Sequence, residues 1–144
     1  MNTGGIDAPY DLNRFTRAQE GVYEEVLSEI KSGSKQSHWM WYVFPQISGL
    51  GHSDIAKHYA IKNVEEAREY LKHPVLGNRL LECTKGVLAI EGRTASEIFG
   101  SPDDLKLRSS MTLFAVISGT GSVFHRVLDK YYWGEHDDRT LQLL

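Results

Sequence analysis

The chain has 144 residues, of which 41% are hydrophobic and 24% are charged. This length and composition are typical of one globular domain with a substantial core, and they argue against long disordered regions. The formal net charge of −3 argues against a general nucleic-acid binder, because such a protein needs a basic surface to displace counterions from phosphates.

The first predicted helix follows residue 10. Asp11 can cap it, because an aspartate side chain accepts hydrogen bonds from the free N–H groups of a helix start. Gly33 can end it in the left-handed conformation. Between them, apolar residues recur every three or four positions and form one stripe: Leu12, Phe15, Ala18, Val22, Val26 and Ile30. We therefore expect one continuous helix from residue 12 to about residue 32.

Residues 34–53 are rich in aromatic side chains and glycine. The run Trp39-Met40-Trp41-Tyr42 is followed by Pro45, which stops any helix, and then by Gly49 and Gly51. This pattern predicts a short helical turn or an extended piece that leads into a loop.

Short helices with clear start signals make up the rest of the chain. They are predicted over residues 55–61 after Ser53 or Asp54, 64–72 after Asn63, 74–90 from Pro74, 95–99 after Thr94, 103–118 after Ser101-Pro102, 123–133 after Ser122, and a final turn after Asp137 or Asp138. Glu66 and Glu97 stand three residues after Asn63 and Thr94, which is the spacing of a capping box.

The helix over residues 103–118 is predicted to lie at the centre of the fold. At about 100° per residue, apolar side chains fall on nearly all of its sides: Leu107, Met111 and Phe114 on one, and Leu105, Leu113 and Val116 on the other. Polar residues lie among them: Arg108, Ser109, Ser110 and Thr112. A buried polar group without a partner costs about 1–3 kcal/mol. These groups must therefore either bind neighbouring chain segments or contribute to a pocket.

Together these patterns predict an all-α fold. No fixed-period repeat and no long linker divides the chain. We expect a frayed N-terminal segment over residues 1–10 and a single helical domain over residues 11–144. The domain is an irregular array of seven or eight helices around the buried central helix.

The cysteine content and the apolar runs indicate a compartment. Cys83 is the one cysteine, which fits a reducing environment. The first nine residues have no basic start and no apolar stretch, so they do not resemble a signal peptide. No apolar run approaches the roughly 18–20 residues of a membrane helix. We therefore expect a cytoplasmic protein that does not bind membranes.

Several motifs occur together in the order seen in a known family. They are Ser37-His38-Trp39-Met40-Trp41, Phe44-Pro45-Gln46, Gly49-Leu50-Gly51, His73-Pro74-Val75-Leu76-Gly77, Arg79-Leu80, Ile98-Phe99-Gly100, Asp103-Asp104-Leu105-Lys106-Leu107 and Ser110-Met111-Thr112-Leu113-Phe114. With them, the chain resembles the bacterial family catalogued as domain of unknown function 1810, from residue 11 to residue 141. The resemblance implies a mainly α-helical fold and no particular activity. Members are sometimes labelled calpastatin, but nothing here resembles a disordered inhibitor repeat.

The aromatic segment offers one half of a candidate binding site. Trp39 and Trp41 can stack a base or another flat ligand, and His38 and Gln46 can add polar contacts. The alternative is that the aromatic rings fill the core under the first helix and that His38 is a hydrogen-bonded structural residue.

The central helix offers the other half. Asp104, Lys106 and Arg108 can bind an anionic ligand, and Arg108 can also stack on the aromatic rings. The alternative is an ion pair between Asp104 and Arg108, which are four residues apart on a helix. We predict that residues 38–41 pack beside residues 104–108 and form one site.

Other polar residues are weaker candidates. His52, Asp54 and His58 could bind a metal, but zinc sites usually need three or four convergent ligands and no further partner is evident, so a solvated helix face is the favoured explanation. The glycines before residue 53 resemble an anion-binding turn, yet they lack the lysine of a P-loop. Cys83 has the apolar neighbours of an inert buried thiol. We expect no metal and no cofactor, and no residue is assigned a catalytic role.

Three functions remain open. The first is a small-molecule site for an anionic or nucleotide-like ligand. The second is a non-enzymatic protein–protein interaction domain with the aromatic segment facing its partner. The third is an enzyme acting on ADP-ribose-type derivatives, suggested by a likeness of residues 110–128 to helical domains that process them. Concave burial of Trp39 and Trp41 beside charged groups would favour the first, and a convex apolar patch the second.

Overall fold

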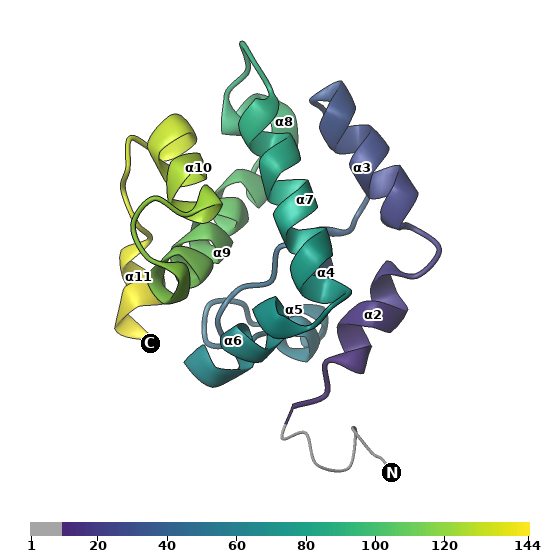
Figure 1. The fold of residues 1–144 in the computed structure, drawn as a ribbon, viewed down its shortest axis with the longest axis vertical. Helices are drawn as coiled ribbons and strands as arrows, with labels where there is room; N and C mark the ends of the chain where they lie inside the picture. The colour runs from purple at the N-terminus through teal and green to yellow at the C-terminus, as the bar shows by residue number, and fades with distance from the viewer. Residues whose placement is uncertain (1–9) are drawn as a thin grey trace.

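The computed structural model describes residues 10–144, and helices form its framework (Figure 1). In chain order they are α2 (Asn13–Gln19), α3 (Tyr23–Ser32), α4 (Met40–Val43), α5 (Asp54–Tyr59), α6 (Val64–Lys72), α7 (Leu76–Ala89), α8 (Ala95–Phe99), α9 (Asp103–Ser118), α10 (Val123–Tyr132) and α11 (Asp138–Gln142). Across this range the one β-type contact is an isolated parallel bridge between Ile47 and Ile61. The predicted all-α fold is confirmed, with ten helices in the described residues instead of seven or eight.

Helix α9 crosses the middle of the molecule and packs against α6, α8, α10 and α11 (Figure 1). Leu107 and all residues from Ser109 to Ala115 are buried. Leu105 and Val116, near the two ends of the helix, are 57% and 45% exposed. The helix is central, as predicted, but burial of its second apolar side is confirmed only at Leu113.

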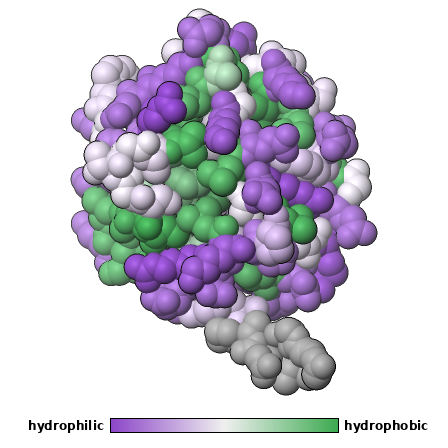
Figure 2. Space-filling model, in the orientation of Figure 1, coloured by the Kyte–Doolittle hydropathy of each residue, from purple (hydrophilic) through white to green (hydrophobic). Residues whose placement is uncertain are grey.

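The remaining helices form two groups of contacts. Helix α7 lies against α3, α6 and α10, while α2 packs on α4 and α4 on α5. On the face shown in Figure 2, apolar residues gather on the side where α9, α10 and α11 lie. No helix in residues 10–144 has the length and apolar character needed to cross a bilayer.

The first predicted helix is in fact two helices, which corrects the expectation of one continuous helix. A turn at Gly21, with φ at +81°, separates α2 from α3. Glycine adopts this conformation readily, whereas other residues do so at a cost. The apolar stripe hides the break because Val22 keeps the three-and-four spacing. Asp11 is not the cap either, because Leu12 occupies the N-cap position of α2 without a side-chain hydrogen bond.

The other predicted caps are largely confirmed. Side-chain oxygens accept hydrogen bonds from the first turns of α5, α6, α8, α10 and α11, and they belong to Ser53, Asn63, Thr94, Ser122 and Asp137. Thr94 and Glu97 form the predicted capping box. Glu66 does not close a box with Asn63, because its Oε1 accepts a hydrogen bond from the N–H of Lys62 at 2.7 Å instead.

Arg14 and Glu66 form a buried ion pair that joins α2 to α6. Arg14 Nη1 lies 2.9 Å from Glu66 Oε2, and the two side chains are 5% and 0% exposed. Arg14 also donates to the backbone carbonyls of Asp11, His58 and Ala60 at 2.6, 2.8 and 2.8 Å. Every nitrogen of this guanidinium therefore has an acceptor within the protein.

Candidate functional site

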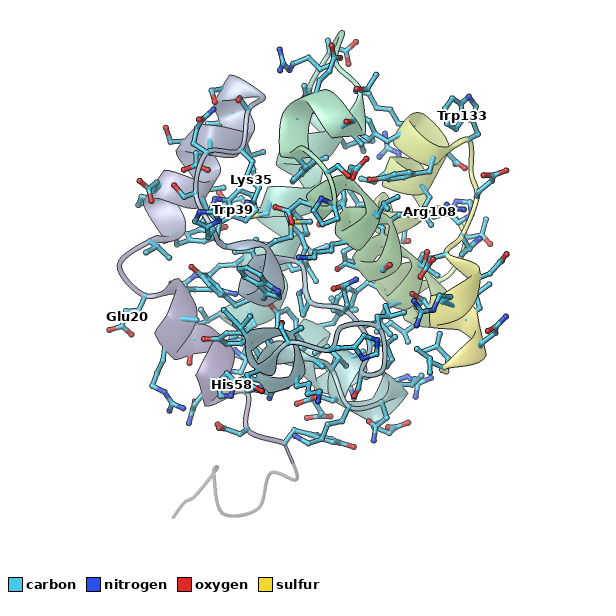
Figure 3. The ribbon with its side chains drawn as sticks, turned by 180° about the vertical axis from the view of Figure 1, so that it is seen from behind. Glu20, Lys35, Trp39, His58, Arg108 and Trp133 are labelled. Atoms are coloured by element: carbon cyan, nitrogen blue, oxygen red, sulfur yellow. The ribbon has the colours of Figure 1, made fainter. Side chains whose placement is uncertain are left out.

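A cavity of about 390 Å³ opens where three parts of the chain meet. Helix α9 contributes Leu105, Lys106, Arg108 and Ser109, with Pro102 just before it; the loop before α5 contributes Gln46, Leu50 and Gly51; and the segment entering α11 contributes Asp137 and Arg139. Figure 3 shows Arg108 on α9, beside the segment that leads to α11. The volume falls within the usual range for small-molecule pockets, about 300–1,000 Å³.

The loop before α5, which forms one wall of the cavity, is held by contacts with Ile61 and with Leu143. Ile61 N–H donates to the Gln46 carbonyl, and Ser48 N–H donates to the Ile61 carbonyl, both at 2.8 Å. Gly49 has φ at +108°, and a Cβ at this position would lie 3.1 Å from Cδ2 of Leu143. Glycine thus gives both the backbone conformation and the space that allow the C-terminal turn to approach the loop.

Polar side chains of α9 hold the third wall of the cavity, the segment leading into α11, in place. Arg108 donates from Nε to the carbonyl of Glu135 at 3.1 Å and from Nη2 to the carbonyl of His136 at 2.7 Å. One turn further along, Thr112 Oγ1 accepts a hydrogen bond from Asp137 N–H at 2.9 Å. Of the two roles that the sequence left open for these polar residues, Arg108 therefore has both: it binds a neighbouring segment and lines the cavity.

The carboxylate of Asp137 is engaged within the protein. Its Oδ2 accepts hydrogen bonds from Ser109 Oγ at 3.0 Å, from Thr140 N–H at 3.1 Å and from Thr140 Oγ1 at 2.5 Å. These bonds cap α11 and join it to α9. Asp137 is the one carboxylate among the lining residues, so its charge faces hydroxyl and amide donors.

Lys106 is the cation on the loop side of the cavity. Its Nζ lies 3.5 Å from Asp103 Oδ1, while Asp103 Oδ2 lies 2.9 Å from Lys35 Nζ. Two lysines therefore share one carboxylate. Lys106 Nζ also lies 4.7 Å from the centroid of the Trp41 ring, which is a cation–π contact.

The two arginines that line the cavity differ in how many hydrogen-bond and ion-pair partners they have within the protein. Arg108 Nη2 lies 3.6 Å from Glu135 Oε1, but the Glu135 side chain is 71% exposed and water weakens such a pair. Arg108 Nη1 makes no hydrogen bond to any residue between 10 and 144. Arg139 is exposed on α11, and within the same range its side chain makes neither a hydrogen bond nor an ion pair. The cavity thus holds three cations and a single, already engaged carboxylate.

Four of the seven predicted binding residues lie together. Gln46, Lys106 and Arg108 line the cavity. Trp41 contacts Lys106 and, with Gln46 and Gly51, lines an adjacent hollow of about 10 Å³, which has room for roughly one water molecule. The aromatic segment and the central helix therefore meet through Trp41 and Lys106.

Trp39, His38 and Asp104 lie outside the cavity. Trp39 is 1% exposed and belongs to the core, and Figure 3 shows it well away from Arg108. His38 is exposed on the surface. Asp104 Oδ1 accepts a hydrogen bond from the N–H of Leu105 at 2.9 Å, near the start of α9. The cavity is thus built without these three side chains.

Glu29 explains why Trp39 points into the core. The Glu29 carboxylate accepts hydrogen bonds from Trp39 Nε1 at 2.8 Å, from Gln36 N–H at 2.7 Å, and from Ser37 N–H and Oγ at 3.0 and 2.6 Å. Burial alone would raise the pKa of Glu29, but these hydrogen bonds, with that of the Ser37 hydroxyl the strongest, lower it to about 2. This cluster ties the aromatic segment to α3.

Arg108 makes neither of the contacts expected from the sequence. Its ion-pair partner is Glu135 and not Asp104, and the cations that contact the aromatic rings are Lys106 at Trp41 and Lys35 at Trp39. Side chains two residues apart on an α-helix point about 200° apart. Lys106 therefore faces Trp41, while Arg108 faces the segment around Glu135 and His136 that leads into α11.

The other lining residues differ in how far the sequence indicated them. Ser109 belongs to the polar set of the central helix and Gly51 to the candidate anion-binding turn, whereas Leu50, Pro102, Leu105, Asp137 and Arg139 were not chosen as binding residues. Asp137 was recognisable as a helix cap, which places Arg139 in the first turn of a helix. No local pattern shows that this turn packs beside α9, because that contact joins residues about 30 positions apart.

The weaker candidates stand apart from the cavity. His52, Asp54 and His58 are exposed at or near α5. In the part of the chain from residue 10 onward, no three His, Cys, Asp or Glu side chains are grouped so that they could hold a metal ion. Cys83 is buried in α7, and this burial raises the pKa of its thiol to about 12.

Fold and cavity together define an all-α domain with a cation-lined pocket beside its central helix. The chain belongs to the family described as "Protein of unknown function (DUF1810)", whose model matches residues 9–144. It is also similar to the conserved hypothetical protein Rv1873 from Mycobacterium tuberculosis, known from a crystal structure at 1.38 Å. The two chains are 52% identical, with a TM-score of 0.93, over 95% of this chain and 98% of that one. No curated protein matches the chain significantly.

Proposed function

We propose that this protein binds a small organic anion in the cavity between α9, the loop before α5 and the start of α11. The observation that carries the proposal is the charge of the lining: Lys106, Arg108 and Arg139 face one space, and its single carboxylate, Asp137, is engaged by Ser109 and Thr140. Cations brought together in a partly enclosed space repel one another, and an anionic ligand relieves that repulsion.

The uncharged part of the lining supports an organic ligand over a bare inorganic ion. Leu50, Pro102 and Leu105 give the cavity apolar walls, and Leu105 is 57% exposed at its edge. Trp41, half-buried next to Lys106, adds a flat aromatic surface close by. Such a mixture of apolar walls and a few charged groups is typical of sites that take a nucleotide-like molecule.

A protein–protein interaction role would rest on a different residue. The aromatic segment does not form a convex apolar patch, because Trp39 is 1% exposed. Trp133 is instead 89% exposed, in a left-handed backbone conformation with φ at 54°. An exposed tryptophan held on a fixed turn is typical of an interface hot spot, so Trp133→Ala would weaken partner binding and leave anion binding unchanged.

The proposal is tested by ligand-induced stabilisation. We would record thermal melting of the purified protein with nucleoside monophosphates, ADP-ribose, sugar phosphates, dicarboxylates and uncharged nucleosides, followed by calorimetry of each hit. Arg139→Gln is the test variant, and Arg126→Gln, an exposed arginine on α10, is the matched control. We expect anionic compounds alone to stabilise the protein, and Arg139→Gln to weaken them. An equal response of Arg139→Gln and Arg126→Gln would overturn the proposal.

A further inference from the structure

The charge that a ligand must balance follows from the lining of the cavity. Three cationic side chains and one carboxylate line it, which leaves a surplus of two positive charges. Nearby carboxylates do little to reduce the surplus. Asp103 is matched by Lys35 at 2.9 Å, and the Glu135 side chain is 71% exposed to water. A ligand with one negative charge would leave part of this surplus, whereas a dianion would balance it.

The hydrogen-bond donors around the cavity match a tetrahedral anion. Arg108 Nη1 and the guanidinium of Arg139 have no acceptor among residues 10–144. Lys106 Nζ adds a third cation, and the side-chain amide of Gln46 adds a neutral donor. These donors come from three separate elements that line the same cavity. A phosphate group presents three charged oxygens to such a set, and arginine binds phosphate with paired donors.

The size of the cavity limits the rest of the ligand. A volume of about 390 Å³ lies near the lower end of the range for small-molecule pockets. The space favours a single compact body over a dinucleotide. Leu50 and Leu105 give that body apolar surroundings next to the charged end.

We infer that the cavity selects dianionic phosphate monoesters with one apolar or aromatic body. This inference rests on the proposed anion-binding function and narrows it to a chemical class. A phosphate monoester carries a charge of about −1.5 to −2 near pH 7, because its second pKa is about 6. Phosphate diesters, sulfate esters and monocarboxylates carry only one charge and bind more weakly.

The first test compares two probes that share one body. Calorimetry at low ionic strength would measure 1-naphthyl phosphate against 1-naphthyl sulfate, and adenosine monophosphate against its cyclic diester. We expect the monoester of each pair to bind at least ten times more tightly. Equal affinities, or a preference for the singly charged probe, would overturn the inference. If phthalate binds and 1-naphthyl phosphate does not, the inference fails while the proposed function stands; if no anion binds, both fail.

The second test uses pH. Between pH 5 and pH 8 a phosphate monoester gains its second charge, so its affinity should rise several-fold. Inorganic sulfate keeps a charge of −2 over this range and reports any titration of the protein itself. The titratable or charged groups near the bound anion are, from α9, Asp103, Lys106 and Arg108; from the C-terminal segment, Glu135, His136, Asp137 and Arg139; and, beyond Asp103, Lys35. An equal pH response of sulfate and 1-naphthyl phosphate would contradict the inference.

The third test places the probe in the cavity. Lys106→Gln and Arg139→Gln each remove one lining charge, and Lys57→Gln and Arg126→Gln remove one charge from the exposed surface of α5 and α10. We expect each cavity variant to reduce the affinity for 1-naphthyl phosphate at least five-fold and to narrow its advantage over 1-naphthyl sulfate. Melting curves of all four variants would show that they fold. Undiminished binding by both cavity variants would overturn the inference.

Discussion

The Arg14–Glu66 pair and the α9 cavity are two charged regions of the same molecule, and they are built in opposite ways. At the first, the carboxylate and all guanidinium nitrogens have partners within the protein, and both side chains are buried. At the second, three cations line an open space whose one carboxylate is occupied by hydroxyl and amide donors. A charged cluster whose partners are complete stabilises the fold, whereas a cluster with surplus charge and free donors has capacity for a ligand.

The largest effect is expected at the buried pair. Glu66→Gln leaves the Arg14 guanidinium buried without its counter-charge, which should lower the free energy of unfolding by about 3–5 kcal/mol. Urea denaturation measures this loss. Replacing both residues, as Arg14→Met with Glu66→Leu, should restore part of the stability, because no charge then remains buried. A loss below about 1 kcal/mol for Glu66→Gln would remove the contrast with the cavity.

A smaller effect is expected at Glu29, another polar group with complete partners. Glu29→Gln should cost about 1–3 kcal/mol near neutral pH, since a carboxamide cannot accept from all four donors. The folded-state pKa of Glu29, about 2, lies below its ordinary value of 4.5, so folding is favoured by ionisation. This contribution is present above about pH 4.5 and is lost as the pH falls toward 2. Denaturation curves of the two proteins should therefore converge in acid; a constant gap would contradict the assignment.

A still smaller loss of stability is expected when the hydrogen bond between α9 and the segment leading into α11 is removed. Thr112→Val removes the acceptor for Asp137 N–H and should lower the stability by about 1 kcal/mol. Thr84→Val is a matched control, because the Thr84 hydroxyl only donates to Leu80 within its own helix. Urea denaturation of both variants would isolate the inter-segment bond. Equal losses would mean that the bond adds nothing to stability.

The smallest change in stability is expected inside the cavity. Arg139→Gln should alter the free energy of unfolding by no more than about 0.5 kcal/mol, because this exposed side chain has no partner in the described chain. The same variant is expected to lose affinity for 1-naphthyl phosphate. A stability loss of more than about 1 kcal/mol at Arg139 would make it a structural residue like Arg14 and break the comparison.

Local signals predicted most of the helices correctly. Helix starts were recognisable at Asn63, Thr94 and Ser122. In each case the side-chain oxygen accepts a hydrogen bond from the backbone N–H three residues later, so the cap depends on residues close together in the sequence. The break at Gly21 was missed for a physical reason. A three-and-four spacing of apolar residues can continue across a turn, so periodicity alone does not show whether the backbone does.

The cavity could be predicted only in part. Gln46, Lys106 and Arg108 were chosen for their chemistry, and they line one space. Arg139 was missed because its place depends on how α11 packs against α9. Trp39 was chosen for the same aromatic character that suits a ligand site, but Glu29 holds it in the core. Composition does not distinguish a ring that faces a ligand from one that faces the core.

The way the C-terminal segment is attached has a consequence for amide hydrogen exchange. Hydrogen bonds with α9 hold this segment, while Leu141, Leu143 and Leu144 remain 40–44% exposed. Little apolar surface must therefore be uncovered for it to detach, and such segments open locally without global unfolding. Its amides should take up deuterium well before those of α9. Because the segment carries Arg139, occupancy of the cavity should slow that uptake.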